Sequence, residues 1–364
     1  MDAYRSAGVD YDALDAAKRE ALAAALSTSG LLAARGARAI DESRGEPAFV
    51  LTLGDTTLAM VLECLGTKSI IAREFEESGG SGHYADIAYD TVAAVVNDLC
   101  CVGALPLVVN AYFATGNSEW YGQGDRLSSL VEGWRRGCFD AGATWGGGES
   151  PTLKSLISDN DIELAGSGIG HVPNESGPIL GDRLAAGDEI IFLASSGLHA
   201  NGASIARRVA HDMADGFHTR LPSGSLLGDA ILTPSRIYAP LIADLLGRGI
   251  VPTYATHITG HGWRKLMRAN RDFVYRIGTL PKVPEVLSFL AQRSGMDERE
   301  SYATFNMGAG FALFCRPEDS ERIVERAKAC GLQPLRGGEL DRGPRSVRLE
   351  PLDITFTSDD LSLR

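Results

Sequence analysis

Apolar residues recur along this chain in runs of strand length and in helical spacing, and the two patterns alternate. Residues 47–53 (PAFVLTL), 105–115 (LPLVVNAYFAT) and 162–172 (IELAGSGIGHV) are predicted to form strands. Residues 127–141 have the spacing of an amphipathic helix, and the alanine-rich residues 11–40 are also helical in pattern. The first half of the chain therefore mixes helices with strands.

The second half repeats this alternation. Residues 189–194 (EIIFLA) and 308–315 (GAGFALFC) are expected to form buried strands. Residues 237–246 and 318–330 are expected to form helices. Strands that alternate with helices in both halves predict an α+β or α/β fold.

A break in the pattern divides the chain. Residues 173–187 hold two prolines and three glycines, a composition typical of a linker. We therefore predict an N-terminal domain over 1–172 and a C-terminal α/β domain over 173–345. The remaining residues, 346–364, are polar, and we expect a poorly ordered tail there.

One helical segment, residues 86–103 (DIAYDTVAAVVNDLCCVG), carries carboxylates within an apolar run. On a helical wheel, Asn97 and Cys101 each lie about 20° from Asp90, and Asp98 lies about 80° away. An unpaired carboxylate in apolar surroundings is costly. A Mg²⁺ ion, which prefers oxygen ligands and often binds substrate phosphates as well, is one natural partner. A partly exposed helix whose acids face water is the alternative.

Composition narrows the possible partners. The net charge of −12 argues against nucleic acid, which needs a basic surface, but a small phosphorylated ligand needs only local donors. The six cysteines show no CxxC pair and no zinc spacing. The N-terminus lacks the apolar core of a signal peptide, and no apolar run reaches the ~18 residues of a membrane span. We expect a cytoplasmic protein.

Two glycine-bearing loops in the first half are candidate ligand sites. Gly66, Thr67 and Lys68 offer backbone N–H groups, a hydroxyl and a cation, which together can hold phosphate. Taken as a bare tripeptide, however, these residues favour a simple turn. Glu149 follows three glycines (146–148) and is either a further metal or nucleotide carboxylate or a surface acid on a flexible turn.

Two loops in the second half carry hydrogen-bonding side chains. Residues 195–202 (SSGLHANG) follow a buried strand and precede a helix, where open sheets present ligands. Residues 256–262 (THITGHG), which contain HITG at 257–260, are expected to form a similar loop that opens a helix from Trp263. His199 and His257 are therefore the candidate catalytic histidines. The other histidines are expected to be surface or packing residues: His83, His171, His211, His218 and His261.

Taken in order, short motifs along nearly the whole chain resemble one family. They are YRSAGVD at 4–10, LGTK at 65–68, VNDL at 96–99, GALP at 103–106, YFATG at 112–116, GGES at 147–150, SSGLHANG at 195–202, LTPSRIY at 232–238, HITG at 257–260 and TFNMG at 304–308. In these motifs the chain resembles aminoimidazole ribonucleotide synthetase, also called phosphoribosylformylglycinamidine cyclo-ligase, of purine biosynthesis.

The resemblance implies a homodimer of two-domain chains. The N-terminal domains would pair across the dimer into a closed β-barrel, flanked by the C-terminal α/β domains. In the family reaction, ATP and Mg²⁺ activate the formyl amide oxygen of formylglycinamidine ribonucleotide as a phosphate ester. The amidine nitrogen then attacks that carbon, phosphate leaves, and the imidazole ring closes.

The resemblance also implies roles for individual residues. It assigns nucleotide binding to Thr67, Lys68, Asp90 and Asn97, and Mg²⁺ binding to Glu63, Asp98 and Glu149. It assigns the phosphorylated substrate to Asn201, Thr259 and Gly260, and catalysis to His199 and His257.

Two segments depart from the family pattern. Glu63, Cys64 and Leu65 stand where the family usually has Asp-Gly-Val, and His261 and Trp263 stand where glycine is usual. Two alternatives therefore stay open. One is a paralogue that activates a different amide with ATP, and the other is a nucleotide-binding protein without catalysis. The retained carboxylates argue against the second.

Overall fold

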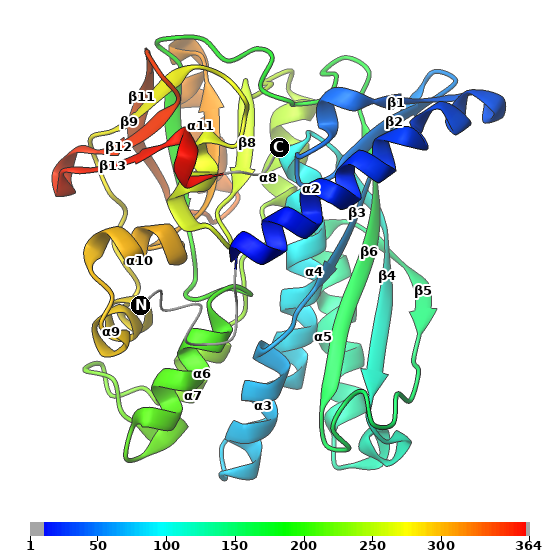
Figure 1. The fold of residues 1–364 in the computed structure, drawn as a ribbon, viewed down its shortest axis with the longest axis vertical. Helices are drawn as coiled ribbons and strands as arrows, with labels where there is room; N and C mark the ends of the chain where they lie inside the picture. Colours follow the sequence, from blue (N-terminus) through cyan, green and yellow to red (C-terminus); the bar gives the residue numbers. More distant parts are fainter. Residues whose placement is uncertain (1–10, 362–364) are drawn as a thin grey trace.

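The computed structural model describes residues 11–361, and they form two sheets with helices packed against them (Figure 1). The stretch at 4–10 that carries part of the family resemblance lies outside the described residues. The mixed helix and strand content predicted from the alternating pattern is confirmed. Within residues 11–361, no helix is both long and apolar enough to cross a membrane.

The first sheet has the strand order β1-β2-β3-β6-β4-β5. Its strands are β1 (Ala37–Ile40), β2 (Phe49–Leu53), β3 (Thr56–Cys64), β4 (Leu105–Thr115), β5 (Thr144–Glu149) and β6 (Ile162–Val172). Neighbouring strands are antiparallel, except that β5 runs parallel to β4 at the edge. The three strands predicted from apolar runs are thus present, and two of them, β4 and β6, lie side by side.

Helix α4 (Tyr84–Cys101) covers one face of this sheet, and α5 (Arg126–Ala141) packs on α4. Glycines in β6 let α4 approach closely, since a Cβ added at Gly168 would lie 2.5 Å from a methyl of Val95. The other helices of this half are α2 (Tyr11–Ser27) and α3 (Lys68–Glu77), with short 3₁₀ helices η1 (Ser29–Arg35), η2 (Asp41–Ser43) and η3 (Ser118–Gly122).

The second sheet has the strand order β13-β12-β9-β11-β7-β10-β8. Its strands are β7 (Glu189–Ala194), β8 (Tyr254–His257), β9 (Phe273–Ile277), β10 (Ala309–Cys315), β11 (Pro334–Arg342), β12 (Ser346–Leu349) and β13 (Ile354–Thr357). The fully buried β10 is antiparallel to both β7 and β8. Strands β7 and β8 therefore run in the same direction, and their C-terminal ends lie on the same side of the sheet.

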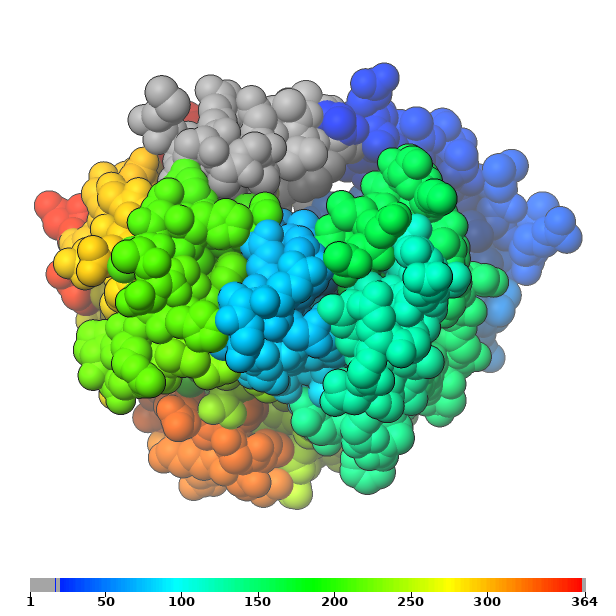
Figure 2. Space-filling model, turned by 90° about the horizontal axis from the view of Figure 1, so that it is seen from below, coloured from blue at the N-terminus to red at the C-terminus, as the bar shows by residue number. Residues whose placement is uncertain are grey.

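Helices surround the second sheet, and several of them contact the first half. They are α6 (Ala203–Asp212), α7 (Leu227–Leu232), α8 (Ala239–Gly247), α9 (Glu285–Ser294), α10 (Glu298–Thr304) and α11 (Pro317–Ala329), with 3₁₀ helices η4 (Gly216–His218), η5 (Gly262–Met267), η6 (Glu350–Leu352) and η7 (Ser358–Asp360). Helix α3 lies between the α6–α7 segment and the rest of the first half (Figure 2), and α4 contacts both β6 and β8. One hydrophobic core runs through both halves.

Three expectations about elements are wrong in part. The helical pattern of residues 11–40 ends with α2 and η1, and β1 follows. Residues 256–257 are the end of a strand rather than a loop, and the helix expected from Trp263 is the 3₁₀ helix η5.

The largest correction concerns residues 346–364, which were expected to be a poorly ordered tail. Strands β12 and β13 lie within it and complete the second sheet, where β12 pairs in parallel with β9. Val347, Leu349, Ile354 and Phe356 alternate with polar residues and face the core. This period-2 pattern is what a half-buried strand requires, although the average composition of the segment is polar.

Candidate active site

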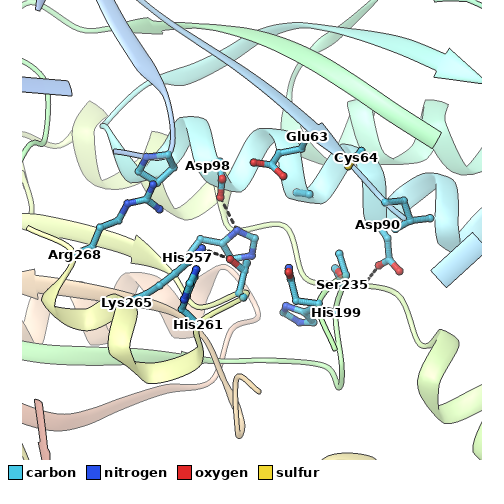
Figure 3. Close-up of a pocket in the computed structure, with 17 residues that line it drawn as sticks. Glu63, Cys64, Asp90, Asp98, His199, Ser235, His257, His261, Lys265 and Arg268 are labelled. Atoms are coloured by element: carbon cyan, nitrogen blue, oxygen red, sulfur yellow. Dashed lines mark hydrogen bonds and ion pairs between the residues drawn. The ribbon is translucent and has the colours of Figure 1, made fainter. Parts of the chain in front are cut away.

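A cavity of about 300 Å³ lies between the two halves, where the ends of β7 and β8 meet α4 and β3 (Figure 3). Its lining residues come from both halves: Pro47, Glu63, Cys64, Leu65, Asp90, Ala94, Asp98, His199, Ala200, Asn201, Ser235, His257, Thr259, Gly260, His261, Lys265 and Arg268. Titratable groups dominate this lining, which is unusual for a space between core elements.

Two carboxylates, Glu63 from β3 and Asp98 from α4, face each other in the cavity. Burial, together with the charge of Asp98 and a hydrogen bond to it, raises the pKa of Glu63 to about 8. Burial also acts to raise the pKa of Asp98, but the hydrogen bond from His257 and nearby positive charges outweigh it, so the net shift is downward. At neutral pH the pair therefore holds one proton, which lies on Glu63.

Asp98 also orients His257 at the end of β8. The ring Nδ1 lies 2.8 Å from Asp98 Oδ1, and because an ionised carboxylate only accepts, Nδ1 is the donor. The opposite nitrogen, Nε2, is buried and has no hydrogen-bond partner among the described residues. In its neutral form, the His257 ring therefore keeps a lone pair on Nε2, as a proton acceptor requires.

The second candidate histidine, His199, lies in the loop after β7 and is held by three contacts. Its Nε2 accepts a hydrogen bond from the backbone N–H of Ser196 at 3.1 Å. Its backbone carbonyl accepts from Lys68 Nζ at 3.0 Å. A Cβ added at Gly310 of β10 would lie 2.7 Å from His199 Cε1, so the ring packs against bare backbone.

Lys68 is completely buried and joins the two halves. Its Nζ lies 2.5 Å from Asp90 Oδ2, and it also donates to the carbonyl of Thr233 at 3.4 Å. The other oxygen of Asp90 accepts from the backbone N–H of Ser235 at 2.6 Å. A charge buried this deeply needs such compensation, because isolated burial costs several kcal/mol per ion.

The opposite end of the cavity is cationic. Lys265 of η5 donates to Thr259 Oγ1, and burial followed by the charge of Arg268 lowers the pKa of Lys265 to about 8. Arg268 donates from Nε to the carbonyl of Gly45 at 2.8 Å. His261 lies beside them with a left-handed backbone (φ of 69°), a conformation uncommon outside glycine.

Most of the residues expected from sequence meet in this cavity. The lining includes Glu63, Asp90, Asp98, His199, Asn201, His257, Thr259 and Gly260. It does not include Thr67, Lys68, Asn97 or Glu149.

The residues outside the lining have other contacts. Thr67 Oγ1 lies 2.9 Å from Ser204 Oγ in the second half. Asn97 is fully buried, donates to the carbonyl of Arg236 at 2.8 Å and accepts from the N–H of Tyr238 at 2.9 Å. In the structure, Thr67 and Asn97 thus connect the two halves, as Lys68 does. Their expected roles in nucleotide binding stay predictions.

Glu149 is exposed at the end of edge strand β5. Within residues 11–361, no three histidine, cysteine, aspartate or glutamate side chains are grouped to hold a metal ion. The three-carboxylate Mg²⁺ site expected from the resemblance is therefore not assembled by these residues of one chain, and the metal roles of Glu63, Asp98 and Glu149 stay predictions.

The sequence reasoning missed the cationic end of the cavity. His261 was expected to be a surface or packing residue, yet it lines the cavity. Lys265 and Arg268 were not singled out, although their i, i+3 spacing directly after HITG places them on one side of a 3₁₀ turn. That spacing was the available signal.

Comparison with known proteins places the chain in a family. Residues 45–172 match the family model for the N-terminal domain of AIR synthase related protein, and residues 185–348 match that for its C-terminal domain. A phosphoribosylformylglycinamidine cyclo-ligase of Methanothermobacter thermautotrophicus is 32% identical over 94% of this chain and 97% of its own. One of Clostridium novyi is 30% identical over 96% and 100%.

Solved structures show the same fold. The hydrogenase maturation protein HypE in complex with ATP superposes with a TM-score of 0.58 at 16% identity, over 82% of this chain and 83% of its own. Thiamine-monophosphate kinase from Stenotrophomonas maltophilia superposes with a TM-score of 0.56 at 17% identity, over 82% and 87%. The two domain matches in their order, and the identity over nearly full length, lead to one assignment: this chain is a member of the AIR synthase related protein family.

Proposed function

We propose that this protein is an ATP-dependent cyclo-ligase that converts formylglycinamidine ribonucleotide to aminoimidazole ribonucleotide. The observation that carries the proposal is the cavity between the halves, which brings both candidate histidines together with three carboxylates and the cationic side chains of Lys265 and Arg268. Family membership supports it, because curated relatives at about 30% identity over nearly full length are named as this ligase.

The chain's own residues suit the chemistry of this reaction. His257, oriented by Asp98, can take a proton from the amidine nitrogen as that nitrogen attacks. Lys265 and Arg268 can offset the negative charge of phosphoryl oxygens.

Mg²⁺ fits the carboxylate pair in this proposal. Glu63 and Asp98 present the oxygen ligands that Mg²⁺ prefers, and they already hold a proton between them where a divalent cation would be favoured. Bound there, Mg²⁺ would neutralise charge on a transferring phosphoryl group. The fit to ATP is supported by the similar fold of HypE, whose structure was determined in complex with ATP.

We also propose that the protein is a homodimer that pairs through the open face of the first sheet. On β3, Met60 and Leu62 point outward and alternate with the inward-facing Ala59 and Val61, and Leu62 is 72% exposed. Leu53 on β2 and Leu107 on β4 are also about half exposed. Several exposed apolar side chains on one sheet face are typical of an interaction surface, and these four are called the exposed apolar patch. The cytoplasm is the proposed location, since the cysteines of residues 11–361 are free thiols.

The reaction is tested with purified protein, formylglycinamidine ribonucleotide, ATP and Mg²⁺. We expect aminoimidazole ribonucleotide and ADP in equal amounts, and loss of both on addition of a chelator. Asp98→Asn should lower kcat/KM by at least about 100-fold, since it removes the charge that orients His257. The matched variant Asp159→Asn changes an exposed acid and should leave kcat/KM intact.

Two other outcomes would contradict the proposal in different ways. ADP without the aminoimidazole product would favour the paralogue that activates a different amide. Cys64 and His261 favour that second candidate, because both departures from the family pattern line the cavity. If the protein forms no aminoimidazole product and binds no nucleotide, both proposed enzyme functions are excluded.

A further inference from the structure

The hydrogen bonds around His199 fix where its proton lies. A backbone N–H can only donate, so the contact from Ser196 N to His199 Nε2 requires a lone pair on Nε2. A neutral imidazole carries its one proton on the other nitrogen, which here is Nδ1. His199 is thus the same Nδ1–H tautomer as His257, but the two rings leave opposite nitrogens without a partner. In His257 the Nδ1 proton faces Asp98 and Nε2 is left to accept, whereas in His199 Nε2 is occupied and Nδ1 is left to donate.

The surroundings of His199 keep the ring neutral. Burial, and then the positive charges of His257, Lys68 and Arg236, lower the pKa of His199 well below its usual value. Asp90, which lines the same cavity, is already paired with Lys68, and no carboxylate acts on His199 to raise its pKa. A second proton on the ring would therefore have no counter-ion, and it would also break the contact from Ser196.

The ring cannot easily turn away from this arrangement. The His199 backbone is left-handed, with φ of 61°, and Lys68 holds its carbonyl. Gly310 leaves room for the ring edge where any side chain would collide with it. Lys68 and Gly310 therefore act as positioning residues for His199.

The Nδ1 donor is left without a partner. It is buried and has no hydrogen bond among the described residues, and the whole residue His199 is only 3% exposed. A buried donor left unpaired costs about 1–3 kcal/mol, so native structures satisfy nearly all of them. His199 lines the cavity, and a group bound there can supply the missing acceptor.

We propose that His199 is a neutral hydrogen-bond donor that binds an acceptor oxygen of the ligand through Nδ1 and does not move a proton during the reaction. The acceptor is a carbonyl oxygen of the amide substrate or a phosphoryl oxygen of the nucleotide. This inference rests on the proposed function for the reaction it serves, and it separates the roles of the two histidines: His257 accepts a proton, and His199 only donates a hydrogen bond.

The tautomer can be measured without any assay of activity. In protein labelled with ¹⁵N-histidine, long-range ¹H–¹⁵N correlation spectra distinguish the two neutral tautomers and the protonated ring. The signals of His199, identified by their loss in His199→Asn, should show a proton on Nδ1 at every pH between 6 and 9. A proton on Nε2, or a ring that becomes protonated in this range, would overturn the proposal.

Kinetics give a second test, because the asparagine amide places an N–H donor close to the position of Nδ1. His199→Ala should lower kcat/KM by about 100-fold or more, as the loss of one preorganised donor does elsewhere. His199→Asn should lose at most about tenfold, and its pH profile should keep the same limbs as the unaltered protein. An asparagine variant as inactive as the alanine variant, with a limb of the profile missing, would mean that His199 moves a proton.

Two further measurements identify the acceptor oxygen. They also test the role of His199 separately from the proposed reaction. If the acceptor is a phosphoryl oxygen, His199→Ala should bind a non-hydrolysable ATP analogue at least tenfold more weakly than the unaltered protein, as measured by calorimetric titration. Unchanged nucleotide affinity with a raised KM for the amide substrate would identify the carbonyl oxygen. If the unaltered protein does not form aminoimidazole ribonucleotide, the proposed function fails, but the ¹⁵N spectra and the nucleotide titration still decide the role of His199.

Discussion

At the scale of single residues, three histidines outside the cavity connect the two halves. His83 Nε2 lies 2.9 Å from Asp229 Oδ1, and His211 Nε2 lies 2.9 Å from Glu74 Oε2. His218 Nε2 lies 3.0 Å from the carbonyl of Ser78. These residues were expected to be surface or packing residues, and their partners lie between 137 and 146 positions away in sequence. Only the fold identifies such contacts.

His83 makes the stability of the protein depend on pH. Its hydrogen bond to Asp86 raises its pKa, burial opposes that shift, and the contact with Asp229 adds to it, so the net shift is upward. A raised pKa in the folded state stabilises the fold fully below the unfolded-state pKa of about 6.5. That contribution is lost as pH rises through the folded-state pKa.

We therefore expect His83→Gln to lower the free energy of unfolding most at pH 5.5 to 6, with a difference that shrinks as pH rises. Urea unfolding at several pH values measures it. Gln292→Asn, at an exposed position on α9, changes a side chain that does not titrate and is the control, which should show no such trend. A His83→Gln difference that is the same at every pH would contradict this interpretation.

At the scale of elements, the crossing of α4 and α5 depends on one glycine. A Cβ added at Gly133 of α5 would lie 1.9 Å from the backbone carbonyl oxygen of Ala85 in α4. A backbone atom in a packed helix cannot move aside as a side chain can. The two helices can therefore lie this close only with glycine at this position.

Gly133→Ala should destabilise the protein by about 1–3 kcal/mol through overpacking, despite the better helix propensity of alanine. Gly247→Ala, at the end of α8 where nothing lies within 4 Å, should be neutral or stabilising. Thermal or urea unfolding of both variants measures the contrast. Equal stability of the two variants would show that α5 shifts to make room.

How much of each element the sequence predicts depends on where its partners lie. The strands β4 and β6 and the helix α4 follow from apolar periodicity, because burial alone determines them. The strands β12 and β13 were missed, because their buried residues are few and average composition hid the alternation. Asn97 was assigned to a ligand, whereas its partners are backbone groups about 140 residues away, which no local pattern encodes.

At the scale of the whole molecule, the cavity exists only where the two halves meet. Its motif residues could be anticipated, since each lies in a loop or on a helix face with a polar signature. The cationic end could not, because Lys265 and Arg268 face Glu63 and Asp98 only once β8 and η5 are placed against α4. The relative placement of two sheets is a property of packing, and a single sequence does not reveal it.

The proposed dimer is tested at this same scale. Leu62→Glu places a charge within the exposed apolar patch, and desolvating an unpaired charge costs several kcal/mol. We expect the unaltered protein to sediment as a dimer and Leu62→Glu as a monomer. Phe139→Glu, at an exposed position on α5, is the control and should leave the dimer intact. A monomeric unaltered protein would exclude the proposed pairing.

Strand β10 has a consequence for which ligands the family can come to accept. It separates β7 from β8, so the segments that lead to His199 and to His257 start two strand spacings apart, about 10 Å. Backbone hydrogen bonds set this span, and no side-chain substitution alters it. Replacements such as those at Glu63 and His261 can therefore change the side chains that line the cavity, while the span between the two histidine segments stays constant. Divergence in such a scaffold favours new ligands of the old size.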